Sequence, residues 1–245
     1  MAGSTSCPAE GRRGLDPLAV WVGLLAVLSV VVAGIAVSRS AVFHARTIEV
    51  RGASHLSRAE VLSLAQVSIA TNVVWLDEAA IERMLTSHAW VADADVRASL
   101  PATIRIRVVE RSPVAVAVDG ARRLLVAGDG TILGPETGGA KLPSIEVPPV
   151  GGPEGPKPGF VGAARALGAM EGDLRSLVRR VAVGLDGTLE VRMRGGLRVS
   201  FGLPSQAEDK VAVLARVLAW AQTQGQPLGS VSVVAPGAPA VSIAG

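Results

Sequence analysis

The most constraining feature of this sequence is an uninterrupted apolar stretch near the N-terminus. Residues 18–37, LAVWVGLLAVLSVVVAGIAV, contain no charged residue and no Asn or Gln, and they lie between Asp16 and Arg39. At a helical rise of about 1.5 Å per residue, this stretch is roughly 30 Å long, which matches the hydrocarbon core of a bilayer. A soluble helix that is apolar on every face would have to lie inside a large domain, whereas the remaining chain consists of short mixed segments. We therefore predict a transmembrane helix at residues 18–37.

A cleaved signal peptide is the main alternative, because Arg12 and Arg13 precede the apolar run and small residues follow it. The apolar region of a signal peptide usually spans only about 7 to 15 residues, which favours a permanent anchor. A mature N-terminus near Ser38 would decide for cleavage. With an anchor, residues 1–17 form a disordered tail, and everything after residue 40 is tethered to the membrane on the other side.

Local charge does not determine which side of the membrane the larger part occupies. Arg12 and Arg13 favour a cytoplasmic tail by the positive-inside rule. However, Arg39, Arg46 and Arg51 follow the helix closely and favour the opposite orientation.

Composition sets limits on the remaining residues, which number about 200 and suffice for one large or two small domains. Hydrophobic residues make up 49% of the chain, aromatic residues only 3%, and Tyr is absent, so the cores are expected to be aliphatic and tolerant of strands. The net charge of +3 and the scattered basic residues do not favour nucleic-acid binding. Cys7 is the only cysteine, so neither an intrachain disulfide nor a Cys-rich metal site is expected, while acylation of Cys7 is left open.

The first half after the apolar stretch has the order strand, helix, helix, strand, strand. Ser57 and Glu60 have the spacing of a capping box, and Asp77 is placed to cap the second helix. Residues 103–110 alternate between apolar and polar positions as in a half-buried strand. The predicted elements cover residues 47–51, 57–65, 77–87, 91–98 and 103–110. This order predicts a small sheet with two helices on one face.

Several motifs in this half resemble the POTRA module. They are the VRG that ends the first strand, His88-Ala89-Trp90-Val91, Leu100-Pro101-Ala102-Thr103, and Glu110-Arg111-Ser112-Pro113-Val114-Ala115. In combination they resemble the POTRA domain of the bacterial cell-division family FtsQ, called DivIB in many Gram-positive bacteria. We therefore expect a POTRA domain at residues 47–115. Glu110 and Arg111 themselves are interpreted as a solvated strand end rather than as a catalytic pair.

The second half is rich in short strands separated by glycine turns. The turns at Asp119-Gly120, Gly128-Asp129-Gly130, Asp186-Gly187 and Gly195-Gly196 favour hairpins, and no glycine pattern of a phosphate-binding loop is present. Residues 148–159 are rich in Pro and Gly and are predicted to form a loop within one domain. A capping box at Ser205 and Glu208 predicts the longest soluble helix, and a loose end is expected after Pro236. Strands are predicted at 114–118, 124–127, 131–133, 141–147, 181–185, 188–194, 197–201 and 230–235, with helices at 160–170, continued by 174–178, and at 205–222.

The fold class predicted from these elements is α+β. It consists of one transmembrane helix, a POTRA domain with the order β-α-α-β-β, and a mostly antiparallel β domain with flanking helices at residues 116–245. The strands around residues 191–201, the helix that contains Glu208-Asp209-Lys210, and the last strand ahead of Ala-Pro-Gly-Ala-Pro are similar to the C-terminal β domain of FtsQ.

No residue pattern of a catalytic, cofactor or metal site is present in the sequence. His44, His55 and His88 are far apart, and the chain contains no His-Glu-x-x-His, Gly-x-Ser-x-Gly or Ser-x-x-Lys motif. We therefore expect a non-enzyme with no cofactor, no metal and no small-molecule substrate.

A sheet with an exposed edge can bind a partner by strand addition, and residues 230–235 are predicted to be that edge because no later strand is recognised. The resemblance implies the same surface, since FtsQ proteins use their last strand and the adjacent helix to bind FtsB, which is itself paired with FtsL. An ordinary terminal strand without a partner is the alternative. The candidate partner-binding residues are Val231, Ser232, Val233, Val234 and Ala235, with Leu197, Val199, Phe201, Glu208 and Arg216 as neighbours.

The resemblance implies a single-pass scaffold with a cytoplasmic N-terminus and an extracytoplasmic bulk, concentrated at the division septum. Such a scaffold gathers FtsB, FtsL and septal peptidoglycan synthases. Two alternatives from other classes remain open: a POTRA adaptor for protein export or envelope assembly, and a membrane-anchored cell-wall enzyme. An adaptor usually carries several POTRA repeats or a barrel, and an enzyme requires a pocket with convergent acids or a nucleophile.

Overall fold

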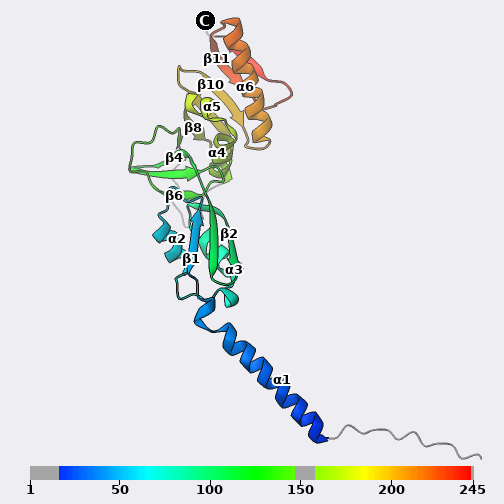
Figure 1. Ribbon diagram of the computed structural model, residues 1–245. Coiled ribbons are helices and arrows are strands. Elements are labelled where there is room, and N and C mark those ends of the chain that lie inside the picture. Colours follow the sequence, from blue (N-terminus) through cyan, green and yellow to red (C-terminus); the bar gives the residue numbers. More distant parts are fainter. Residues whose placement is uncertain (1–16, 147–157, 244–245) are drawn as a thin grey trace, which may run out of the picture.

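The computed structural model describes residues 17–146 and 158–243 and has three consecutive parts (Figure 1). Helix α1 (Pro17–Ser38) lies at one end, a small three-stranded unit follows, and a larger nine-stranded sheet lies beyond it. Helix α1 is long and apolar enough to cross a membrane, and its residues from Trp21 to Val37 are all exposed. The helix predicted at residues 18–37 is confirmed, whereas most of the tail expected at residues 1–17 lies outside the described residues.

The first sheet has the strand order β1-β3-β2, with β1 parallel and β2 antiparallel to β3. Ile104, Ile106 and Val108 of β3 are buried among the helices, whereas Arg105 and Arg107 lie on the opposite, open face. This alternation confirms the predicted half-buried strand. The elements of this unit are β1 (Thr47–Arg51), α2 (Arg58–Ala65), the 3-10 turn η2 (Val73–Trp75), α3 (Glu78–Thr86), β2 (Val91–Ser99) and β3 (Thr103–Glu110).

The predicted helix caps of this unit are formed. The Glu60 backbone N–H donates to Ser57 Oγ at 3.2 Å, and the Ser57 N–H donates to the Glu60 carboxylate at 2.7 Å, which completes the capping box. The Ala80 N–H donates to Asp77 Oδ1 at 2.9 Å at the start of α3. Short polar side chains thus satisfy the backbone donors that have no partner at a helix start.

The second sheet has the strand order β12-β11-β10-β9-β8-β7-β4-β5-β6. Helices α4 and α6 pack on one of its faces, where Phe201, Leu167 and Leu214 are completely buried. Five of the eight strand pairings are antiparallel, so the predicted mostly antiparallel sheet is confirmed. Its elements are β4 (Pro113–Asp119), β5 (Arg122–Ala127), β6 (Ile132–Pro135), β7 (Ser144–Glu146), α4 (Pro158–Ala169), α5 (Gly172–Leu177), β8 (Val178–Val183), β9 (Leu189–Met193), β10 (Arg198–Gly202), α6 (Ala207–Gln224), β11 (Leu228–Ser232) and β12 (Ala240–Ile243).

The start of α6 differs from the prediction. The helix begins at Ala207, and its N-cap Gln206 has a left-handed backbone (φ 55°, ψ 40°) with no side-chain cap bond, so the capping box predicted at Ser205 and Glu208 is wrong. A tertiary contact holds the helix start instead, because Lys210 in its first turn is buried and donates to two backbone carbonyl groups at the end of β10 and just after it.

The C-terminal strands also differ from the prediction. The strand predicted at residues 230–235 is observed as β11, which begins at Leu228 and ends at Ser232. The loose end expected after Pro236 is wrong for residues 240–243, which form β12. The loop predicted at 148–159 lies largely outside the described residues, and its last two positions already belong to α4.

Candidate functional site

The predicted partner-binding strand is not the edge of its sheet. Strand β11 pairs in parallel with β10, where Val199 lies beside Val231, and it pairs antiparallel with β12, where Val231 lies beside Val241. The prediction that residues 230–235 form a free edge is therefore wrong. The four residues of β12 are short for a strand signal and follow a connection that contains Pro236 and Pro239, so no local pattern in the sequence indicated their pairing.

Most of the candidate residues on β10 and β11 contribute to the core. Val231 and Val233 are 1% and 0% exposed, and Val199 and Phe201 are buried with them. Ser232 and Leu197 are half-buried, whereas four candidates are exposed: Val234, Ala235, and on α6 Glu208 and Arg216. The buried candidates shape this end of the sheet, and only the exposed ones are accessible to another chain.

The accessible edge at this end of the sheet is β12. All four of its residues, from Ala240 to Ile243, are exposed, and within the described ranges 17–146 and 158–243 β12 pairs with β11 only. Val241 and Ile243 alternate along the strand with small residues and are 39% and 55% exposed. An exposed strand with unpaired backbone groups on one side and apolar side chains at alternate positions is the arrangement to which a partner strand can add.

Lys210 holds the helix beside this edge in place. Its Nζ donates to the carbonyl oxygen of Leu203 at 2.7 Å and to that of Phe201 at 3.2 Å, and it lies 5.4 Å from the centre of the Phe201 ring. Burial lowers the pKa of this lysine below its usual range. The sequence indicated Lys210 only as part of the Glu208-Asp209-Lys210 run. Its burial could not be predicted, because no local pattern distinguishes a buried lysine from an exposed one.

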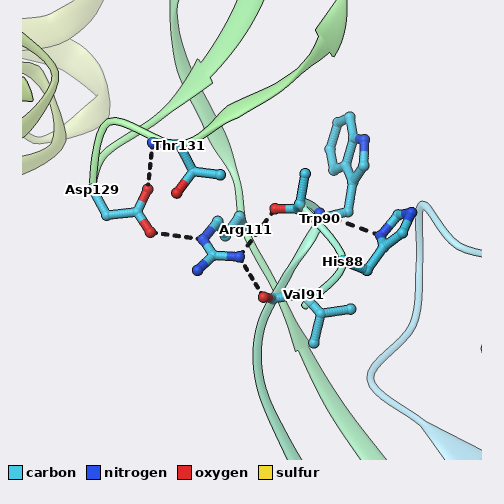
Figure 2. Close-up of polar contacts among 7 residues, drawn as sticks. His88, Trp90, Val91, Arg111, Asp129 and Thr131 are labelled. Atoms are coloured by element: carbon cyan, nitrogen blue, oxygen red, sulfur yellow. Dashed lines mark hydrogen bonds and ion pairs between the residues drawn. The ribbon is translucent and has the colours of Figure 1, made fainter. Parts of the chain in front are cut away.

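A second polar cluster joins the two sheets at Arg111 (Figure 2). Arg111 Nε donates to Asp129 Oδ2 at 2.7 Å, and its Nη1 donates to the carbonyl oxygens of Ala89 and Val91. Asp129 lies in the turn between β5 and β6, where its Oδ1 accepts a hydrogen bond from the Thr131 N–H at 2.9 Å. One guanidinium group thereby connects the start of β2 in the first sheet with a turn of the second.

Glu110, the neighbour of Arg111, binds the segment that precedes α2. Its carboxylate accepts hydrogen bonds from the N–H groups of Leu56 and His55, each at 2.8 Å, and from Ser54 Oγ at 2.7 Å. Burial opposes ionisation of this carboxyl, but the hydrogen bonds outweigh it and lower the pKa of Glu110 to about 2. The interpretation of Glu110 and Arg111 as a solvated strand end is therefore wrong, since both side chains hold separate segments together.

The connection between α1 and the first sheet is also held by side chains. Asn72 Nδ2 donates to the carbonyl oxygen of Ser38 at 2.8 Å, and Trp75 Nε1 donates to Ser38 Oγ at 3.3 Å. Trp75 is 61% exposed. Its largely exposed ring thus lies next to the last residue of the apolar helix.

Residues 43–111, which comprise the first sheet and its two helices, match the family model described as "POTRA domain, FtsQ-type". The chain is 28% identical over 215 residues to cell division protein FtsQ of Mycolicibacterium smegmatis, a match that covers 87% of this chain and 62% of that relative. It is 29% identical over 206 residues to cell division protein FtsQ of Mycobacterium tuberculosis, with 84% and 64% covered. The first sheet and its helices are thus an FtsQ-type POTRA domain, and most of the chain is similar to FtsQ proteins. The resemblance that the POTRA motifs indicated is therefore confirmed.

The present chain spans just under two thirds of the length of these curated relatives, 62% and 64%. A similarity also exists to the solved major extracytoplasmic domain of the cell division protein DivIB from Geobacillus stearothermophilus. It has 16% sequence identity and a TM-score of 0.35, and it covers 46% of this chain and 96% of that one.

Proposed function

We propose that this chain is a non-enzymatic, membrane-anchored scaffold of bacterial cell division, which binds other division proteins by strand addition at β12. Three features support the proposal: the similarity to FtsQ proteins, one helix long enough to anchor the chain, and a sheet whose terminal strand has only exposed residues. The exposed strand supports strand addition as the binding mode, because backbone groups on the free side of β12 lack a strand partner among the described residues.

The partner in this proposal is FtsB, paired with FtsL, and the complex links further to septal peptidoglycan synthases. The proposed orientation has a cytoplasmic N-terminus and extracytoplasmic sheets, with the protein concentrated at the septum. An added strand would extend the sheet beyond Val241 and Ile243, and the exposed α6 residues Glu208 and Arg216 are proposed as further contacts. The family relationship favours this role over that of an export adaptor.

A photo-crosslinking experiment tests the edge directly. A photoreactive amino acid placed at Val241 or Ser242 in the full chain should crosslink to a division protein, identified by mass spectrometry after purification from detergent. The matched control is the same amino acid at Glu190, an exposed residue in the interior of the same sheet. Crosslinks at Glu190 with none at β12 would contradict the proposal.

Removal of residues 240–243 separates two possible uses of this end of the sheet. If the partner adds to β12, co-purification should be lost while the thermal unfolding temperature changes little, because the deleted residues are exposed. Stronger co-purification would contradict addition to β12, and it would mean that the partner pairs with β11 in the place that β12 occupies.

A further inference from the structure

The open face of the nine-stranded sheet carries a row of arginines in direct cross-strand register. Arg192 on β9 lies beside Arg180 of β8 on one side and beside Arg198 of β10 on the other. Arg194 follows two residues after Arg192, and Arg179 precedes Arg180. These five arginines, with Met193 and the Gly195-Gly196 turn, line one hollow of about 470 Å³.

The charges in this row are largely uncompensated in the described part of the chain. Arg180 forms an ion pair with Glu146 at 3.0 Å, but Arg192, Arg194 and Arg198 make no ion pair there. Glu190 shares the face of Arg192 but lies beside Ser200 and Ala182 instead of an arginine. Like charges placed directly opposite each other destabilise a sheet, so folding alone does not explain why three neighbouring strands each contribute an arginine here.

The first sheet of the same chain shows the contrasting arrangement. Its open face also carries arginines in register, yet acidic residues are placed between them. The ion pairs join Arg97 to Asp95 at 2.8 Å, Arg51 to Glu49 at 3.1 Å and Arg105 to Glu49 at 3.7 Å. Among the described residues, three of the four arginines on the open face of the first sheet therefore have an acidic partner, whereas in the row of the second sheet only Arg180 has one.

The surroundings of the row favour a compact anion over an acidic peptide. Strand β9 is paired on both sides, so no backbone edge is free to hold a peptide strand at this place. Met193 is 4% exposed and points into the core, and the other lining residues are arginines and glycines, so no apolar anchor is offered. Recognition therefore depends on charge and on guanidinium groups, whose planar forks bind phosphate oxygens in pairs.

The size of the row indicates more than one phosphate. Neighbouring strands lie about 4.8 Å apart, so three arginines in register extend over roughly 10 Å. Figure 1 places β8 and β10 beyond the first sheet, far from α1, which favours a soluble or polymeric ligand over the headgroups of the membrane that holds α1. We propose that this hollow binds an anion that carries two or more linked phosphate groups. The inference is independent of the proposed role of β12.

Binding can be measured by titration calorimetry on the full chain in nanodiscs of neutral phosphatidylcholine, with inorganic diphosphate and tripolyphosphate as probes. The double variant Arg192→Gln, Arg198→Gln should bind both probes at least roughly tenfold more weakly. The reason is that it loses charge-assisted hydrogen bonds from guanidinium to phosphate, which are stronger than hydrogen bonds between neutral groups. The matched control Arg105→Gln, Arg107→Gln removes two charges from the open face of the first sheet and should leave binding unchanged. The unfolding temperature of the Arg192, Arg198 variant should not fall, since like charges are removed.

Three outcomes would overturn the proposal. The first is the absence of diphosphate and tripolyphosphate binding to the unmodified chain, or an equal loss of binding in both double variants. The second is tighter binding of poly-glutamate than of tripolyphosphate through Arg192 and Arg198, which would indicate an acidic peptide. The third is loss of diphosphate binding in nanodiscs of phosphatidylglycerol, which would indicate that lipid headgroups occupy the hollow.

Discussion

Arg111 Nε and Asp129 Oδ2 lie 2.7 Å apart and connect two parts of the chain with separate hydrophobic cores. Arg111 follows β3 of the first sheet, and Asp129 lies in a turn of the second. The side chain of Arg111 is only 19% exposed, so this ion pair is less screened by water than the pairs on the open sheet faces. Arg111 of the POTRA motif therefore acts at the junction between the two sheets.

Arg111→Ala should lower the free energy of unfolding by about 1–3 kcal/mol, because it removes the guanidinium that donates to the Ala89 and Val91 carbonyl groups and to Asp129 Oδ2. Chemical denaturation of the full chain in detergent measures this change. Arg51→Ala is the matched control, since Arg51 is 71% exposed and its loss should cost less than about 0.5 kcal/mol. Equal effects of the two substitutions would contradict a role for Arg111 at the junction.

Glu110 should make the stability of the chain depend on acid pH. Its pKa falls from 4.5 to about 2 on folding, so its contribution is fully present above pH 4.5 and is lost as the pH falls toward 2. Glu110→Gln should therefore lower the free energy of unfolding by about 1–3 kcal/mol at pH 7 and by much less at pH 2. Denaturation series between pH 2 and 7 measure the difference in the free energy of unfolding between the two proteins. A difference that stays constant across this range would exclude Glu110 as a source of the pH dependence.

Lys210→Ala should destabilise the C-terminal sheet by about 2–3 kcal/mol, because the carbonyl groups of Phe201 and Leu203 lose a buried donor. Arg216→Ala on the exposed side of the same helix is the control, and its expected cost is below about 0.5 kcal/mol. Thermal unfolding followed by circular dichroism compares the two variants. A Lys210 variant as stable as the Arg216 variant would mean that the helix start is held by packing alone.

Trp75 should lie at the membrane interface, because its indole N–H binds Ser38 at the end of α1 and its ring is 61% exposed. Tryptophan is favoured at the level of the lipid headgroups. In nanodiscs that contain brominated lipids, a variant with Trp75 as its only tryptophan should show strong fluorescence quenching. A variant that retains only Trp220, which is 49% exposed on α6 of the second sheet, serves as the control and should show little. Quenching of Trp75 as weak as that expected for Trp220 would place Trp75 away from the bilayer.

The sequence predicted well those elements whose causes lie within a few residues. Uniform apolarity indicated α1, alternation indicated β3, and the spacing of Ser57 and Glu60 indicated the cap of α2. The POTRA motifs also indicated the domain that the family model matches at residues 43–111. The capping box predicted at Ser205 failed because a buried contact of Lys210, made across the fold, holds the start of α6 instead.

Sequence by itself therefore determined most of the helices and strands, because these follow from periodicity, turn residues and short-range capping, and its motifs indicated the POTRA domain. Tertiary structure alone decided that β12 pairs with β11 and that Arg111 forms an ion pair with Asp129. It also decided that Arg180, Arg192 and Arg198 lie in one row across three strands. Each of these outcomes depends on strand register and on contacts between segments that are distant in the chain. Such contacts exist only after the chain has folded, so no local pattern of residues can specify them.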